Sequence, residues 1–412
     1  MTFGRLATRF LCWSLAVLLL AFSVACTGSA AYLAAPSIDH VLTLAAVAVL
    51  AGAAIAAVAG LVLAPGLGLS RRAGAAVLAV LAAATSSTLL VLLAGDGRTA
   101  VAAASTDARG PHETWELSTG SRVAVWRRPA DTPKHRTQVV FLHGGPGMYT
   151  QASKMAEGAA LRAAGFDTVY FDQAGGGASD RLPVGQYTVA RAIADVDAVR
   201  ERLGVPRVVL WGNSYGGQLA AAYTAAHPDR VAALLLTSPG TFPGTEADRD
   251  YSMTNRPDDS ELSGRMLLAT LLIDANPVLA EDLVGQAESG AMLDAATRSD
   301  LAGGFVCRGA DDAPLRAELA TERGGNLFPN RLLATGIESH RPRRSTVDAV
   351  PTLVVRGACD FVPRGNAERY TAFAKPSRLV DIPADDHGLR LNRSAVDAAV
   401  TEFAGHDLAQ LP

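Results

Sequence analysis

The chain has 412 residues, which is long enough for two domains or for one large domain with additions. Hydrophobic residues make up 49% of it, a high share for a soluble protein, and most of the excess lies before residue 96. The formal net charge is only −3, so the sequence offers no basic surface, and nucleic acid is excluded as an expected partner.

Three uncharged apolar runs occupy the first hundred residues, at 10–35, 41–64 and 73–94. Each is long enough to cross a hydrocarbon core of about 30 Å at about 1.5 Å per residue. Buried helices of a soluble domain are the alternative interpretation, but charge-free runs of about 20 residues or more are rare outside membranes. The sequence therefore predicts a membrane region at residues 1–95 with three transmembrane helices.

Arginines predict the orientation of these helices. Arg5 and Arg9 precede the first run, and Arg71 and Arg72 separate the second from the third, whereas the segment between the first two runs has neither arginine nor lysine. Positive charge remains on the cytoplasmic side. We therefore expect a multi-pass protein of the cell membrane, in contact with lipid, whose residues after 94 are extracytoplasmic.

The first run has a second interpretation as a cleaved signal. The letters "SVAC", which end at Cys26, loosely resemble a lipoprotein cleavage box, although Ser23 replaces the usual leucine-like residue. Cleavage there would leave the later domain on the same outer side.

Beyond a predicted linker at 96–111, rich in small and polar residues, the pattern changes. Short apolar strands alternate with alanine-rich helical stretches over residues 112–412. The predicted strands are "RVAVW", "TQVVFLHG", "DTVYFDQ", "RVVLWGNS", "VAALLLTSP", "PTLVVRGACD" and "SRLVDIP". This alternation predicts an α/β fold in which a mostly parallel sheet has helices on both faces. Ligands of such sheets bind beyond the carboxyl ends of the strands.

A serine stands at one of these strand ends. Ser214 lies in "RVVLWGNSYGG", between an apolar strand and an alanine-rich helix. Gly212 and Gly216 flank it, and we expect them because a Cβ would not fit where strand and helix approach each other. A GxSxG pattern can arise by chance, but its position between strand and helix favours a catalytic nucleophile.

A serine nucleophile needs a base and an acid that orients the base. Asp360 and His387 follow later strands in the order Ser, Asp, His, so they are the predicted acid and base. Asp385 and Asp386 compete for the role of the acid, but they are too close to the histidine along the chain to reach its far nitrogen easily, and we expect loop charges. His340 is a remote alternative for the base.

The glycine-rich segment "VVFLHGGPG" at 139–147 predicts an oxyanion hole. Its glycines let backbone N–H groups approach a developing negative charge, so Gly144 or Gly145 would donate one hydrogen bond and the N–H of Tyr215 another. A phosphate-binding loop is the alternative, but GxxxxGK[ST] is absent.

Five motifs together resemble the proline iminopeptidase (prolyl aminopeptidase) family of α/β-hydrolases. They are "HGGPG" at 143–147, "DQAGGGAS" at 172–179, "GNSYGG" at 212–217, "GACD" at 357–360 and "DHG" at 386–388. The resemblance covers about residues 112–410. It implies a serine peptidase with the triad Ser214, Asp360 and His387, without metal or cofactor, that removes an N-terminal residue, often proline, from short peptides.

The sequence departs from this family at several positions. Ala174 replaces the arginine of the usual "DQRG", so the role of that cation is missing or supplied differently, and Tyr215 replaces a common tryptophan. An insert at about 241–350 resembles the family's helical cap in position and length. Within it, "GIESH" resembles a stretch whose glutamate binds the substrate's amino group, which implies this role for Glu338; an exposed helix glutamate is the alternative.

The four cysteines lack the spacing of a zinc site, and no metal site is expected. Cys307 and Cys359 are the only two in the predicted extracytoplasmic domain, where a disulfide could connect the cap to the loop of Asp360. Two free buried thiols are the alternative.

The sequence thus predicts a membrane-bound serine hydrolase with a short peptide or a small amide or ester as substrate. Two other functions stay open. One is an esterase or other small-molecule hydrolase that uses the same triad, because the fold does not determine the substrate. The other is a non-catalytic membrane receptor on a hydrolase scaffold.

Overall fold

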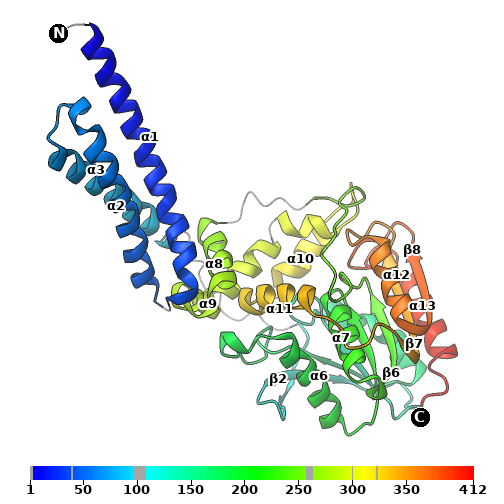
Figure 1. Cartoon of the computed structure of the whole chain (residues 1–412). Helices are drawn as coiled ribbons and strands as arrows, with labels where there is room; N and C mark the ends of the chain where they lie inside the picture. The colour runs from blue at the N-terminus through cyan, green and yellow to red at the C-terminus, as the bar shows by residue number, and fades with distance from the viewer. Residues whose placement is uncertain (1–2, 39, 96–107, 257–262, 299, 322) are drawn as a thin grey trace. The chain divides into compact units, whose positions relative to one another are not determined.

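The computed structural model describes residues 3–38, 40–95, 108–256, 263–298, 300–321 and 323–412 (Figure 1). The predicted linker at 96–111 therefore lies mostly outside the described residues. The chain divides into two compact units. The N-terminal unit comprises Met1–Arg98 and Ser263–Gly285, and the second unit comprises Thr99–Leu262 and Gln286–Pro412.

Long apolar helices form most of the N-terminal unit. They are α1 (Phe3–Ala34), α2 (Val41–Leu67) and α3 (Arg71–Gly95), with the short 3-10 helix η1 (Ala35–Ser37) between the first two. Close packing depends on small residues, because a Cβ on Gly60 would lie 2.3 Å from the carbonyl oxygen of Gly74. Thr27 of α1 and Ser86 of α3 share a hydrogen bond of 3.1 Å between their hydroxyl groups. By length and composition, the three helices can each cross a membrane.

Two pieces of the predicted cap insert also belong to the N-terminal unit. They are α8 (Gly264–Ala275) and the first part of α9 (Pro277–Arg298). α9 is interrupted at Gly285, whose φ of 54° and ψ of 158° are not helical. The residues of α9 after this break belong to the second unit.

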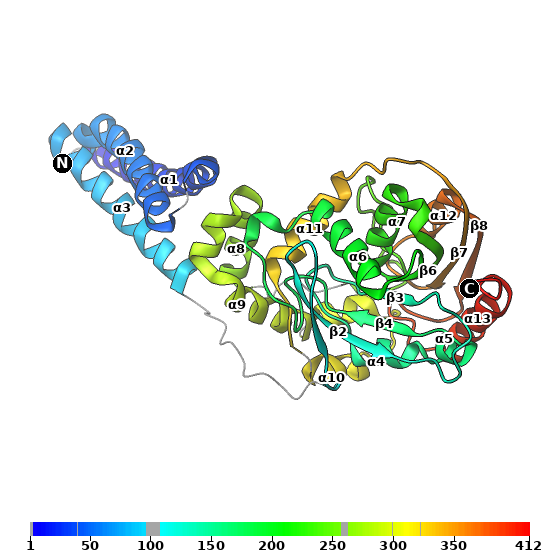
Figure 2. The same cartoon turned by 90° about the horizontal axis from the view of Figure 1, so that it is seen from below.

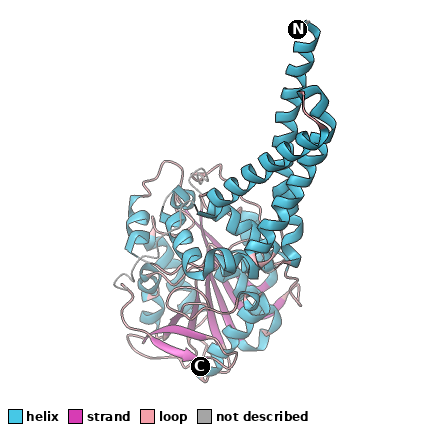
Figure 3. Cartoon of the chain, turned by 90° about the vertical axis from the view of Figure 1, so that its left-hand side faces the viewer, coloured by secondary structure: helices cyan, strands magenta, loops and turns pink. Residues whose placement is uncertain are grey.

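An eight-stranded sheet forms the centre of the second unit, in the order β1-β2-β4-β3-β5-β6-β7-β8 (Figure 3). β1 and β2 pair antiparallel, as do β2 and β4, and every other neighbouring pair is parallel. The predicted mostly parallel sheet is thereby confirmed. The strands are β1 (Glu113–Glu116), β2 (Arg122–Arg128), β3 (Val139–Leu142), β4 (Thr168–Phe171), β5 (Val208–Asn213), β6 (Val231–Thr237), β7 (Val347–Gly357) and β8 (Ala374–Ile382).

Alternating strand residues point to opposite faces of the sheet and build one apolar core on each. In β3, Val140 and Leu142 belong to the apolar cluster that includes residues of α6, α7 and α12, whereas Val139 and Phe141 belong to the cluster that includes residues of α4, α5 and α13. Figure 2 shows these helices beside the sheet. The α-helices of this unit outside α9 are α4 (Ala152–Glu157), α5 (Ala159–Ala164), α6 (Val189–Leu203), α7 (Tyr215–Ala226), α10 (Ala313–Thr321), α11 (Leu327–Ser339), α12 (Arg364–Phe373) and α13 (Arg393–His406). The helices on both faces are those expected of this fold class.

Candidate active site

Ser214 occupies the single residue between the end of β5 and the start of α7. Its φ of 51° and ψ of −118° are unfavourable for a residue with a Cβ, as expected for a nucleophile on a sharp strand-to-helix turn. The flanking glycines are required, because a Cβ on Gly212 would lie 2.5 Å from the carbonyl oxygen of Gly216. A Cβ on Gly216 would lie 1.8 Å from the carbonyl oxygen of Leu142. The turn therefore has the close backbone approach that the sequence predicts.

The structure brings the three predicted triad residues together. His387 Nε2 lies 3.0 Å from Ser214 Oγ, and His387 Nδ1 lies 2.7 Å from Asp360 Oδ1. Asp360 and His387 are each only 5% exposed, and Asp360 Oδ1 also accepts a hydrogen bond from the backbone N–H of Val362. An ionised carboxylate accepts hydrogen bonds only, so Nδ1 carries the imidazole proton and Nε2 is free to accept the serine proton.

The competing residues have other partners. The carboxylate of Asp385 accepts hydrogen bonds from the backbone N–H groups of Leu391 and Asn392, at 2.9 and 3.2 Å. Asp386 accepts one from the N–H of Gly388, and burial raises the pKa of its carboxyl group. Both therefore organise the loop that carries His387. His340 lies at the C-terminal end of α11, where burial lowers its pKa.

The loop expected to form the oxyanion hole lies against Ser214. A Cβ on Gly144 would lie 3.0 Å from Ser214 Cβ, and Gly145 has a φ of 125°, which favours glycine. Tyr215 is the first residue of α7, so its N–H belongs to the unpaired donors of a helix N-terminus. Gly144, Gly145 and Tyr215 all line one cavity with Ser214.

His143 and Gln173 hold this loop in place, a role that the sequence reasoning missed. His143 Nε2 accepts a hydrogen bond from the backbone N–H of Gln173 at 2.9 Å, and its Nδ1 donates to the carbonyl oxygen of Gly144 at 2.7 Å. The Gln173 side chain donates back to the carbonyl oxygen of His143. Burial lowers the pKa of His143, which matches its role as a neutral acceptor. The sequence signal that could have predicted this contact was the joint occurrence of "HGGPG" and "DQ".

Arg109 was also missed, because it lies in the predicted linker. Its guanidinium group contacts both carboxylate oxygens of Asp172, at 2.9 and 2.7 Å, and packs 4.2 Å from the ring centroid of Trp126. Asp172 is fully buried and also accepts from the N–H groups of Thr150 and Ala178. The cation beside Asp172 therefore comes from a distant part of the chain.

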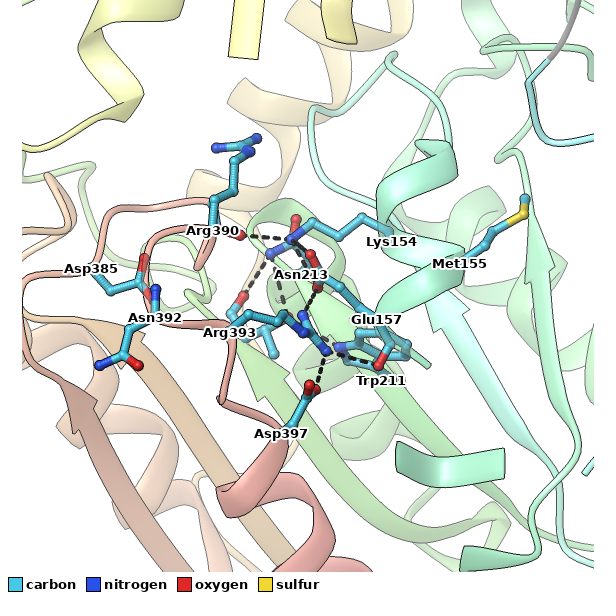
Figure 4. A network of polar contacts seen from close by, with 12 residues as sticks. Lys154, Met155, Glu157, Trp211, Asn213, Asp385, Arg390, Asn392, Arg393 and Asp397 are labelled. Atoms are coloured by element: carbon cyan, nitrogen blue, oxygen red, sulfur yellow. Dashed lines mark hydrogen bonds and ion pairs between the residues drawn. The ribbon is translucent and has the colours of Figure 1, made fainter. Parts of the chain in front are cut away.

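A partly buried ionic network holds the residue that follows His387 (Figure 4). Lys154 of α4 is 3% exposed, and its ammonium group donates to the carbonyl oxygen of Gly388 at 2.8 Å and to the Glu157 carboxylate at 2.9 Å. Arg393 of α13 contacts the other oxygen of Glu157 at 3.0 Å and also pairs with Asp397. The network thus fixes the residue that follows His387.

The structure contains the Cys307–Cys359 disulfide, one of the two alternatives that the sequence left open. The Cα atoms lie 5.6 Å apart, within the usual range. Cys359 directly precedes Asp360, and its N–H donates to the carbonyl oxygen of Asp385. The bridge therefore connects the insert to the loop that carries Asp360.

A cavity of about 410 Å³ opens above the triad. The ring centroid of Phe361 lies 4.4 Å from that of His387, and the ring centroid of Phe305 lies 5.9 Å from it, so apolar rings pack beside the imidazole. Glu338, from α11, lines the same cavity, and its carboxylate forms no ion pair with the described residues. Within the described ranges, no group of three or more His, Cys, Asp or Glu side chains is placed to hold a metal ion.

Residues 137–389, more than half of the chain, match a protein family described as alpha/beta hydrolase fold. The chain belongs to this family. A proline iminopeptidase of Arabidopsis thaliana is 37% identical over 99 residues, which cover 24% of this chain and 25% of that protein. A (lyso)-N-acylphosphatidylethanolamine lipase of Homo sapiens is 34% identical over 110 residues, or 26% of this chain and 32% of that protein. The alignments thus span about a quarter to a third of these relatives.

Among solved structures, the proline iminopeptidase of Mycobacterium smegmatis resembles this chain with a TM-score of 0.50 and 20% identity. The alignment covers 72% of this chain and 99% of that structure. At this identity the likeness shows the α/β-hydrolase fold alone.

Proposed function

We propose that the chain is a membrane-bound serine hydrolase that removes the N-terminal residue, proline among others, from short peptides. The observation that carries the proposal is the continuous Ser214–His387–Asp360 hydrogen-bond chain, with contacts of 3.0 and 2.7 Å at the wall of the cavity. A hydroxyl, an imidazole and a buried carboxylate in this order are the parts that acyl transfer to serine needs.

Catalysis would proceed through an acyl-enzyme. Ser214 Oγ attacks the carbonyl carbon of the scissile amide while His387 Nε2 takes the hydroxyl proton, and Asp360 stabilises the resulting imidazolium. The backbone N–H groups of Tyr215 and of Gly144 or Gly145 would stabilise the oxyanion, each worth about 2.7 to 4 kcal/mol in the transition state. His387 then protonates the leaving amine as the C–N bond breaks. Water, deprotonated by the same imidazole, releases the acyl group from Ser214.

Glu338 supports an aminopeptidase rather than an endopeptidase. This half-buried residue lines the cavity, and its carboxylate has no ion-pair partner among the described residues, so it is available to bind the ammonium group of a free N-terminus. An internal peptide segment has no charge to offer at this position and would leave the carboxylate unpaired.

We infer that α1, α2 and α3 span the cell membrane, with the N-terminus on the cytoplasmic side and the second unit, which contains the sheet, on the extracytoplasmic side. The arginines at 5, 9, 71 and 72 support this orientation. The Cys307–Cys359 disulfide supports it independently, because disulfides persist in oxidising compartments and are rare in the cytosol.

Ser214→Ala tests the nucleophile in the detergent-solubilised full chain. We expect turnover of a proline arylamide to fall by about 10⁶-fold, the order seen when a triad serine is removed. A fluorophosphonate probe should label the native chain but not the variant, and Ser394→Ala, a change at an exposed serine of α13, should alter neither result. Undiminished turnover in Ser214→Ala would refute the assignment, and a native chain that the probe fails to label would favour a non-catalytic receptor.

An esterase or lipase activity on the same triad is the second candidate. The similarity to the human lipase favours it, and an ester substrate needs no carboxylate anchor. A panel of matched amides and esters with free or acetylated amino groups separates the two. A preference for free amino groups that Glu338→Gln abolishes supports the peptidase, whereas equal turnover of acetylated esters by both forms supports the esterase.

A further inference from the structure

Helix α8 is apolar around its whole circumference. From Met266 to Ile273 every residue except Thr270 is apolar. Met266, Ala269, Leu272 and Ile273 form a buried face, with exposed fractions of 9% or less. Leu267 and Leu271, one turn apart on the other side, are 56% and 46% exposed. A helix that is apolar all round normally lies in a core or in lipid, and no core of the described residues covers Leu267 and Leu271.

The first turn of α9 also has an exposed apolar residue. Val278 exposes 49% of its surface, beyond the extended residue Asn276 that separates α9 from α8. Inside the hairpin, Arg265 is 2% exposed and its guanidinium group donates to the carbonyl oxygen of Leu283 at 2.8 Å. This hydrogen bond connects the two helices of the α8–α9 hairpin, while Leu267, Leu271 and Val278 remain exposed.

This hairpin is bonded to one particular end of the helix bundle. The side-chain amide of Asn276 donates to the carbonyl oxygens of Ala35 and Ile38, at 3.1 and 3.3 Å, in the connection between α1 and α2. Asp282 accepts a hydrogen bond from the N–H of Val41 at 3.0 Å and so satisfies a free donor at the N-terminus of α2. α8 also contacts η1 and α3.

The position limits what can cover the exposed leucines. The connection between two membrane-spanning helices lies at a bilayer surface, so the apolar face of α8 is next to lipid if α1 and α2 span the membrane. With 12 residues α8 is about 18 Å long and cannot itself cross a core of about 30 Å. A short apolar helix at this place fits the interfacial region, where lipid chains meet water.

We propose that α8 is an interfacial membrane helix whose Leu267 and Leu271 contact phospholipid acyl chains. The proposal rests on the membrane location inferred above and extends lipid contact from the N-terminal helices to the insert of the hydrolase. The predicted cap insert at 241–350 would then contribute to two different places. Residues 263–285 would lie at the lipid surface, whereas α11 lines the cavity beside Ser214.

Site-directed spin labelling of the full chain in phosphatidylcholine nanodiscs tests this. Cys12→Ala and Cys26→Ala first remove the two free thiols, and the Cys307–Cys359 disulfide does not react with the label. Leu267→Cys and Leu271→Cys are then introduced into this background one at a time and labelled. Collision rates with oxygen, which concentrates in lipid, are compared with those of a nickel chelate, which remains in water. Leu50→Cys, 68% exposed in α2, is the membrane control, and Ser394→Cys, exposed in the second unit, is the water control.

We expect the oxygen-to-nickel ratio at 267 and 271 to exceed that at 394 several-fold and to lie below that at 50. A ratio at 267 and 271 equal to that at 394, while 50 remains lipid-like, overturns the proposal and leaves the membrane location intact. Low collision rates with both reagents at 267 and 271 also overturn it, because they mean that a second protein surface covers the helix. If 50 also behaves like 394, the membrane location and the proposal fail together.

Discussion

Removal of the Cys307–Cys359 disulfide should destabilise the second unit. The size of the effect depends on the length of the chain segment that the disulfide closes into a loop. The two cysteines are 52 residues apart. In the chain-entropy description, closing a loop of this length removes about 14 cal/mol/K from the unfolded chain, or about 4 kcal/mol at 25 °C. We therefore expect Cys307→Ala/Cys359→Ala to lower the free energy of unfolding by about 4 kcal/mol, a large part of the stability of a typical domain.

Urea unfolding of the solubilised chain, followed by tryptophan fluorescence, measures this difference, since Trp115, Trp126 and Trp211 all lie in the second unit. A reductant provides the matched control. It should lower the midpoint of the native chain and of Cys12→Ala/Cys26→Ala equally, and leave Cys307→Ala/Cys359→Ala unchanged. Native and variant chains with the same midpoint without reductant would refute the reasoning, as would two titratable thiols in the denatured, non-reduced second unit.

Other predictions concern the groups that support the triad. Arg109→Met should cost about 3 to 5 kcal/mol of stability by chemical denaturation, because it leaves the buried Asp172 carboxylate without its cation, and Arg109→Lys should recover part of the loss. Lys154→Met should lower kcat more than it raises KM, because it releases the Gly388 carbonyl beside the base; an unchanged kcat would contradict this role. Burial lowers the pKa of His143 below 6.5, so its neutral form contributes stability that is present above pH 6.5 and is lost as the pH falls below it. His143→Gln should therefore unfold with a weaker pH dependence below pH 6.5, and an unaltered pH profile would show that another group titrates there.

Local rules were sufficient to predict the nucleophile turn. Ser214 lies between a strand and a helix whose patterns are visible within about 20 residues, and the two glycines follow from the close backbone approach. Asp360 and His387 could be predicted because parallel strands end at the same edge of the sheet, so β7 and β8 deliver them side by side. Each of these inferences needed only the order of elements and the geometry of parallel strands.

Contacts between distant segments could not be predicted in this way. Arg109 lies 63 residues before Asp172, in a stretch whose composition is that of a linker, and no period or motif relates the two. The attachment of residues 263–285 to the N-terminal unit was equally hidden. α8 has 12 residues, too few for the length that identifies a membrane span, and the side-chain contacts of Asn276 and Asp282 depend on tertiary structure.

The Arg109–Asp172 pair also affects how the alanine at position 174 is interpreted. From the sequence alone, an alanine in place of the arginine of "DQRG" leaves open whether the role of that cation is missing or supplied differently. The structure instead places a guanidinium group on Asp172 from another segment, and that carboxylate also accepts two backbone N–H groups. The Asp172 side chain thus has a cation and two backbone donors as partners, as a buried carboxyl group at the start of the loop from 172 to 178 requires. Ala174 is therefore not by itself an argument against the proposed peptidase, and the proposed preference for substrates with a free amino group depends on Glu338, which lines the cavity without an ion-pair partner among the described residues.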